Sequence, residues 1–129
     1  MDIARTGIIL NTEKFDECVA FYRDIFGLKV LFEESHGDFR LTCFDFGGCY
    51  LMVETEGHAK PEGKSIRESP AKLRFNVPDI HATAQALRDS GIDAEIIESD
   101  WGSTINIYDP DGNRIGIRDE EGFVNQLGT

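Results

Sequence analysis

The stretches FYRDIFGL at residues 21–28 and YDPDGNRI at residues 108–115 decide the fold of this chain. The first ends an amphipathic helix, predicted over residues 13–26, with a glycine at the position where helices commonly end in a left-handed residue. The second combines the residues of a tight turn with the start of an alternating strand. Together they predict a chain in which helices and strands are mixed.

A second helix is predicted over residues 80–90, where Gly91 again follows the last turn. Its N-cap is Asp79, and the N-cap of the first helix is Thr12, because short oxygen-bearing side chains accept hydrogen bonds from the first free N–H groups. Alternation of apolar and polar residues predicts eight strands. They cover residues 5–11, 28–34, 39–46, 50–54, 72–77, 94–98, 104–108 and 114–118.

The two halves of the chain repeat each other. Gly27 and Gly91 lie 64 positions apart, and so do Asp45 and Asp109. The sequence therefore predicts two modules of the order strand–helix–strand–strand–strand, at residues 1–56 and 71–119, joined by a loop at residues 57–70. We expect one α+β domain over residues 1–129, because a single module leaves its sheet half-buried and needs its twin. Side by side, the modules would form a cupped, eight-stranded mixed sheet with helices on its convex face.

The motifs at residues 21–28 and 108–115, together with the repeat, resemble those of the vicinal oxygen chelate superfamily, which holds glyoxalase I, extradiol dioxygenases and bleomycin resistance proteins. The resemblance covers nearly the whole chain. It implies the two-module fold, a small-molecule cleft and a homodimer. It does not fix a chemistry, because one fold hosts unrelated activities.

The resemblance also implies four metal-ligand positions, two in each module. On this sequence they fall on Gly7, Met52, Lys72 and Gly116. Glycine has no side chain, a thioether is a poor ligand for hard cations, and an ammonium group repels them. We therefore expect no metal and no other cofactor.

Glu54, Glu56 and His58 share one strand parity and form the alternative metal set, with His36 able to approach from a separate loop. A solvated, charged segment is the interpretation we favour for these residues.

Basic residues alternate with apolar ones on the strands of the second module. Lys72, Arg74, Arg114 and Arg118 fall on the polar faces, opposite the residues expected in the core. Such a cluster is costly unless carboxylates or a bound anion offset it. We therefore predict an anion-binding cleft. Its full set of ligand-binding residues is Asn11, Tyr50, Met52, Glu54, Lys72, Arg74, Trp101, Asn106, Arg114 and Arg118, with Phe44 as a further part of the apolar wall. The alternative is a solvated face whose basic groups pair with carboxylates.

Composition narrows the function classes. The chain has 24 Asp+Glu against 13 Lys+Arg, a net charge of −11, which disfavours nucleic-acid partners. No apolar stretch is long enough for a membrane span, and three cysteines without a paired spacing favour a reducing compartment, the cytoplasm. We predict metal-independent binding of a small anion. The alternative is a metal-dependent lyase, isomerase or dioxygenase of the glyoxalase type, so whether the chain is an enzyme stays open.

Overall fold

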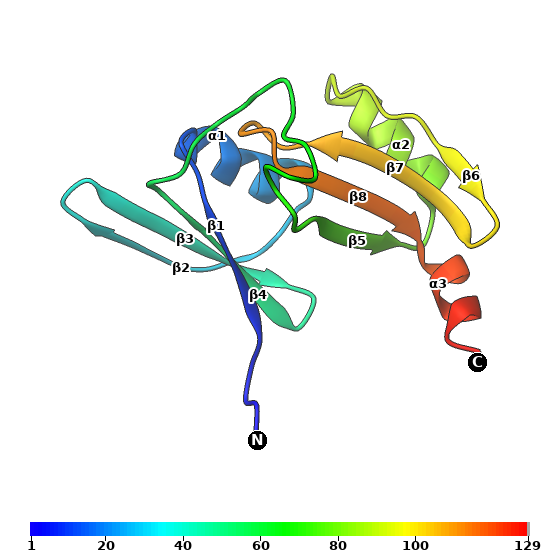
Figure 1. Ribbon diagram of the computed structural model, residues 1–129, viewed down its shortest axis with the longest axis horizontal. Coiled ribbons are helices and arrows are strands. Elements are labelled where there is room, and N and C mark those ends of the chain that lie inside the picture. The colour runs from blue at the N-terminus through cyan, green and yellow to red at the C-terminus, as the bar shows by residue number, and fades with distance from the viewer. Residues whose placement is uncertain (129) are drawn as a thin grey trace. The chain divides into compact units, whose positions relative to one another are not determined.

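The computed structural model describes residues 1–128 and divides the chain into two compact units, Met1–Pro61 and Glu62–Thr129 (Figure 1). We call them unit 1 and unit 2 and describe each by itself. Each unit follows the predicted order of strand, helix and three strands. Strands and helices are both present, and the α+β class of two βαβββ modules is confirmed. The eight strands form two hydrogen-bonded sheets of four strands each.

Unit 1 contains a sheet in the order β1-β4-β3-β2, in which only the β1–β4 pair is parallel. The strands are β1 (Gly7–Asn11), β2 (Val30–His36), β3 (Phe39–Phe46) and β4 (Cys49–Glu54). The helix predicted over residues 13–26 is α1 (Phe15–Ala20), which continues as a single wide π-helical turn, η1 (Phe21–Ile25). Tyr22 is fully buried, and its ring lies edge-on to Phe21 at 5.1 Å. The core is therefore aromatic where helix meets sheet.

The predicted N-cap of the first helix is wrong. Thr12 donates its hydroxyl to the carbonyl oxygen of Glu54 at 2.9 Å, and its N–H donates to the same oxygen. Thr12 thus extends the pairing of β1 with β4, and α1 begins without a side-chain cap. Gly27 does have the predicted left-handed backbone, with φ 66°.

Unit 2 repeats this topology as β5-β8-β7-β6, again with one parallel pair, β5–β8. Its elements are β5 (Leu73–Val77), α2 (Ile80–Asp89), β6 (Ile97–Ser99), β7 (Gly102–Tyr108), β8 (Arg114–Asp119) and α3 (Glu120–Gln126). Asp79 caps α2 as predicted, accepting a hydrogen bond from the Ala82 N–H at 3.0 Å. Ala84 and Leu87 of α2 and the isoleucines of β7 and β8 form the buried core.

The strand predicted over residues 94–98 is shifted to Ile97–Ser99. The carbonyl oxygen of Ala94 accepts two hydrogen bonds from the Arg88 guanidinium, at 3.0 and 2.8 Å. The segment around Ala94 is therefore hydrogen-bonded to α2, and pairing with β7 begins only at Ile97.

The repeated aspartates support equivalent turns. Asp109 accepts hydrogen bonds from the N–H groups of Asp111 and Asn113, at 2.9 and 2.8 Å, in the turn between β7 and β8. Asp45 accepts one from the Gly48 N–H, at 3.4 Å, between β3 and β4. The 64-residue repeat is thus visible in hydrogen bonding as well as in sequence. No helix of residues 1–128 is long and apolar enough to cross a membrane.

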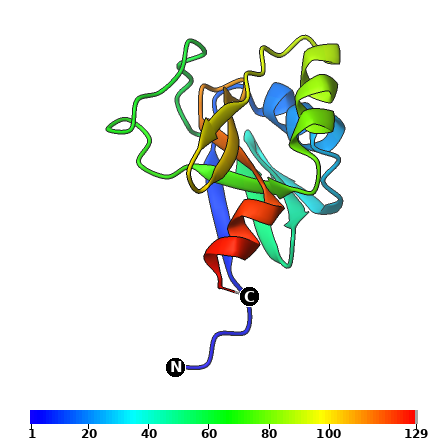
Figure 2. The same ribbon diagram turned by 90° about the vertical axis from the view of Figure 1, so that its right-hand side faces the viewer.

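Helix α3 was not predicted. It follows β8 directly and is the red segment beside the C-terminus in Figure 2. Asp119 caps it: Oδ2 accepts a hydrogen bond from the Gly122 N–H at 2.9 Å, and Oδ1 accepts one from the Ser103 N–H at 2.7 Å. These bonds, led by the one from Ser103, lower the pKa of Asp119.

Replacing Asp119 by Ala should lower the free energy of unfolding by about 1–2 kcal/mol, the usual effect of losing a helix cap. Because the folded-state pKa is depressed, this contribution is complete above the ordinary Asp pKa of about 3.9 and disappears as pH falls through the folded value. Urea unfolding at neutral and acidic pH measures it. The exposed Asp93→Ala variant is the control, and equal stability of the two variants at pH 7 would contradict the assignment.

Candidate functional site

Each sheet has one face packed against its helix and an opposite face, which we call the open face. In unit 2 the strand register places Arg74, Gly116 and Asn106 in one row across β5, β8 and β7. Tyr108 and Arg114 form the next row. The polar faces predicted from sequence therefore coincide with one continuous open face.

Three basic side chains gather on this face, and we call Lys72, Arg74 and Arg114 the cationic cluster. Lys72 Nζ donates to Asn106 Oδ1 at 2.8 Å, and Arg114 Nη1 donates to the Ser69 carbonyl at 3.1 Å. Arg74 lies 6.0 Å from the Trp101 ring centroid and has no hydrogen-bond partner among residues 62–128. The cationic cluster thus has N–H groups that donate no hydrogen bond to the described residues of unit 2.

No carboxylate of unit 2, within its described residues, forms an ion pair with the cationic cluster at 4.0 Å or less. The predicted alternative, basic groups paired with surface carboxylates, therefore does not describe these three side chains within their own unit. Burial lowers the pKa of Lys72, and the charges of Arg114 and Arg74 lower it further. The pKa of Arg74 is also lowered, by burial first and then by Arg118.

Arg118 shares the open face but is engaged differently. It is 6% exposed, with Nη1 donating to Gln126 Oε1 at 2.7 Å and Nη2 donating to the Trp101 carbonyl at 2.8 Å. Its guanidinium lies 4.7 Å from the Trp101 ring centroid and 5.4 Å from that of Phe123. Arg118 therefore joins α3 to the sheet, and both terminal nitrogens of its guanidinium, which was predicted to line the anion-binding cleft, already donate to acceptors of unit 2.

In unit 1 the predicted ligand residues also share one open face. Tyr50, Met52 and Glu54 of β4 lie opposite Gly7, Ile9 and Asn11 of β1 in the register. Asn11 Nδ2 donates to the Thr55 carbonyl at 2.9 Å. Phe44 does not belong to this wall: it is fully buried on the helix side, with its ring 6.4 Å from that of Tyr22. Strand parity places it there, since Phe44 pairs with the buried Leu51.

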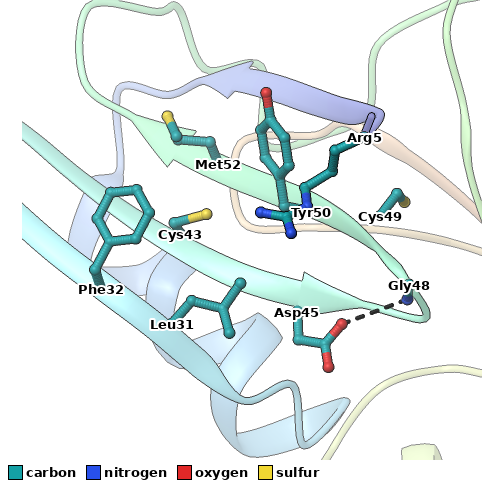
Figure 3. A pocket seen from close by; sticks show the side chains of 9 residues that line it. All are labelled: Arg5, Leu31, Phe32, Cys43, Asp45, Gly48, Cys49, Tyr50 and Met52. Atoms are coloured by element: carbon teal, nitrogen blue, oxygen red, sulfur yellow. Dashed lines mark hydrogen bonds between the residues drawn. The ribbon is translucent and has the colours of Figure 1, made fainter. Parts of the chain in front are cut away.

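A pocket of about 470 Å³ lies on the open face of unit 1 (Figure 3). Its apolar wall contains Leu31, Phe32, Cys43, Tyr50 and Met52, with Arg5 and Asp45 as the charged groups. This size and lining suit an apolar group of a small molecule.

Sequence analysis missed Leu31 and Phe32. Strand alternation places consecutive residues on opposite faces, but a bulge in β2 between Val30 and Phe32 brings both side chains to the pocket. No sequence pattern marked this irregularity.

The four positions implied for a metal do not fit one. A Cβ atom at Gly7 would overlap the Tyr50 ring. A Cβ atom at Gly116 would lie 2.9 Å from Lys72 Cε and 3.2 Å from Arg74 Nη1, shorter than ordinary contacts. Both glycines thus lack a ligand side chain, and other side chains fill the space beside them. Among the residues that the structure describes, no group of three His, Cys, Asp or Glu side chains is placed to hold a metal ion.

Comparison with known proteins identifies the family. The family model of the Glyoxalase/Bleomycin resistance protein/Dioxygenase superfamily matches residues 3–117. The chain belongs to this superfamily. An uncharacterized protein of Bacillus subtilis (strain 168), YraH, is 29% identical over 121 residues, which span 85% of this chain and 93% of that protein.

Solved structures of the superfamily show the same fold at low sequence identity. A variant of FosX, a fosfomycin resistance protein from Listeria monocytogenes complexed with Mn(II) and 1S,2S-dihydroxypropylphosphonic acid, has a TM-score of 0.74 and 13% identity, with both chains fully covered. TnmS3, an antibiotic binding protein from a Streptomyces species, has a TM-score of 0.70 and 18% identity, covering 92% of this chain and 98% of its own. One structure contains a metal and the other is named as a binding protein, so the fold alone does not choose between these functions.

The different roles of two arginines can be tested by stability. Arg74→Met should keep the free energy of unfolding or raise it by up to about 1 kcal/mol, because it removes a like charge and no hydrogen bond. Arg118→Met should lower it by about 2–4 kcal/mol, because it removes buried hydrogen bonds and ring contacts. Urea unfolding of both variants measures the difference, and equal losses would refute the separation of the roles.

Proposed function

We propose that the chain binds a small organic anion on the open face of unit 2, without a metal. The observation that carries this proposal is the cationic cluster: three basic side chains share one face and form no ion pair with a carboxylate among residues 62–128. The chain as a whole has a net charge of −11, so this local excess of positive charge is opposite in sign to the charge of the protein. Several basic side chains on one face are the groups that bind an anion.

Electrostatics favour an anion over an empty face. Burial first, and then the like charges nearby, lower the pKa values of Lys72 and Arg74. A carboxylate or phosphonate would offset these charges by accepting charge-assisted hydrogen bonds. The Arg74 guanidinium, which has no hydrogen-bond acceptor among the described residues of unit 2, presents the fork suited to a carboxylate.

The neutral groups around the cluster give the anion a defined position. Asn106 holds the Lys72 ammonium at 2.8 Å, and the Ser69 carbonyl holds one end of the Arg114 guanidinium at 3.1 Å. Both cations are therefore partly oriented before a ligand binds, which reduces the entropy lost on binding.

Binding of oxalate, a small dicarboxylate probe, tests the proposal. In isothermal titration calorimetry, Arg74→Met and Lys72→Met should each weaken the affinity roughly tenfold, since a hydrogen bond to a charged group is worth about 1.5 kcal/mol. Arg67→Met, a change at an exposed arginine outside the cluster, is the matched control and should bind as the parent does. Parental affinity in both cluster variants would remove the proposal.

The rival function is a metal-dependent lyase, isomerase or dioxygenase, which other members of the superfamily make reasonable. Supporting our proposal over it, side chains of Tyr50, Lys72 and Arg74 occupy the space beside two of the implied ligand positions. We propose that Asn11, Tyr50, Met52 and Glu54, which share the open face of unit 1, serve ligand binding there and hold no metal. We further propose that the protein is a homodimer and acts in the cytoplasm.

Metal content separates the two functions. Protein purified without chelators should contain Ni, Zn, Fe and Mn well below one ion per chain by mass spectrometry, because the four implied positions offer no ligand set. It should also fail to turn over the hemithioacetal of methylglyoxal and a thiol. Stoichiometric metal together with turnover would establish the rival.

A further inference from the structure

Lys72 is placed unlike an ordinary surface lysine. Its stem crosses the sheet backbone at Gly116, so closely that an added Cβ atom there would lie 2.9 Å from Cε. The side chain is partly buried, and its Nζ bonds to a neutral amide oxygen, that of Asn106. A lysine whose acceptor is an amide and whose charged neighbours are guanidinium groups gains little from carrying a proton.

The charged strand residues on this face are all basic. The titratable or charged groups of the strands that share it with Lys72 are Arg74 from β5, Arg114 and Arg118 from β8, and the Tyr108 phenol from β7. The loop before β5 contacts this face through the Ser69 carbonyl and Gly63 and adds Glu62, Lys64 and Glu68, and the segment before β6 adds Asp93 and Glu95, which share a pocket with Asn106. The residues of β6 on this face, Ile97 and Ser99, are uncharged. Burial, Arg114 and Arg74 accordingly lower the pKa of Lys72, which increases the fraction of neutral amine at a given pH.

We propose that Lys72 is a nucleophilic amine that forms an imine with the carbonyl carbon of a carboxylate-bearing aldehyde or ketone. This inference rests on the proposed function, because Arg74 and Arg114 of the cationic cluster are needed to hold the carboxylate while Lys72 reacts as the neutral amine. The ligand class is therefore an oxo acid whose carbonyl group lies next to its carboxylate. Arg74, with its free donors, would hold the carboxylate while its carbonyl carbon faces Nζ.

The step needs no oxidant, reductant or metal. The Nζ lone pair forms the C–N bond, and the carbonyl π electrons move to oxygen, which takes up a proton released by the amine. The hydroxyl group then leaves as water with the second amine proton, and a C=N bond remains. Amine and carbonyl thus give an imine and one water molecule. Neutral lysine beside other cations is a known way to make this nucleophile available near pH 7.

Reductive trapping tests the inference. The full chain is incubated with glyoxylate and sodium cyanoborohydride, and the labelled residue is found by peptide mass mapping. Lys72 should be labelled at least about tenfold faster than Lys64, because a bound ligand raises the effective concentration of the carbonyl. Lys64 is a matched internal control, since its Nζ also donates to an amide oxygen, that of Asn113, at 2.8 Å.

Two further results complete the test. Lys72→Arg keeps the positive charge but has no primary amine, so labelling at this position should disappear. The labelling rate of Lys72 relative to that of Lys64, a ratio that removes the shared requirement of cyanoborohydride for a protonated imine, should also be largest below the ordinary lysine pKa of about 10.4.

The outcomes separate this inference from the proposed function. If oxalate binds but Lys72 and Lys64 are labelled at equal rates, imine formation at Lys72 is refuted while anion binding stands. If oxalate does not bind and the two rates are equal, both are refuted. Faster labelling of Lys72, suppressed by oxalate, supports both.

Discussion

The arrangement of unit 2 depends on the absence of a side chain at Gly116. The Lys72 stem and the Arg74 guanidinium both rest on the backbone at this point, where a Cβ atom would meet them at 2.9 and 3.2 Å. A larger residue would require the flexible ends of both side chains to shift. The same glycine stands at a position where the superfamily resemblance implies a metal ligand. At Gly116, therefore, the missing ligand side chain leaves the space that Lys72 and Arg74 occupy.

The two units show how one topology produces different surfaces. Met52 precedes Gly116 by 64 residues and has the equivalent place in unit 1. There the middle of the open face is apolar, with Phe32 and Cys43 beside Met52 in the pocket. In unit 2 the glycine admits long basic side chains from the neighbouring strand instead. The fold fixes where the open face lies, and a few residues on it decide the chemistry.

Sequence predicted the periodic features of the structure and missed those that depend on distant contacts. Alternation gave the correct face for Lys72, Arg74 and Arg114, because strand parity is a local property. It did not reveal that the guanidinium of Arg118 is buried, since that depends on Trp101 and on α3, two elements brought to it by the fold. Helix α3 itself has a recognisable cap, Asp119, but Gly122 in its first turn weakens the signal.

Other errors have the same origin. Thr12 has the composition of an N-cap, yet pairing with Glu54, which lies 42 residues later, uses its hydroxyl. Tertiary hydrogen bonds outweighed a local preference of about 1 kcal/mol. In the pocket of unit 1, Tyr50 and Met52 were predicted but Leu31 and Phe32 were not, because a bulge in β2 interrupts the alternation of side chains between the two faces.

The central claim is that the cationic cluster, and no metal, holds the ligand. The most direct measurement is a crystal structure of protein purified without chelators and grown with oxalate. Oxalate density should lie within hydrogen-bond distance of Lys72 Nζ and the Arg74 guanidinium. A metal ion coordinated beside Gly7 or Gly116, with these side chains displaced, would contradict the claim.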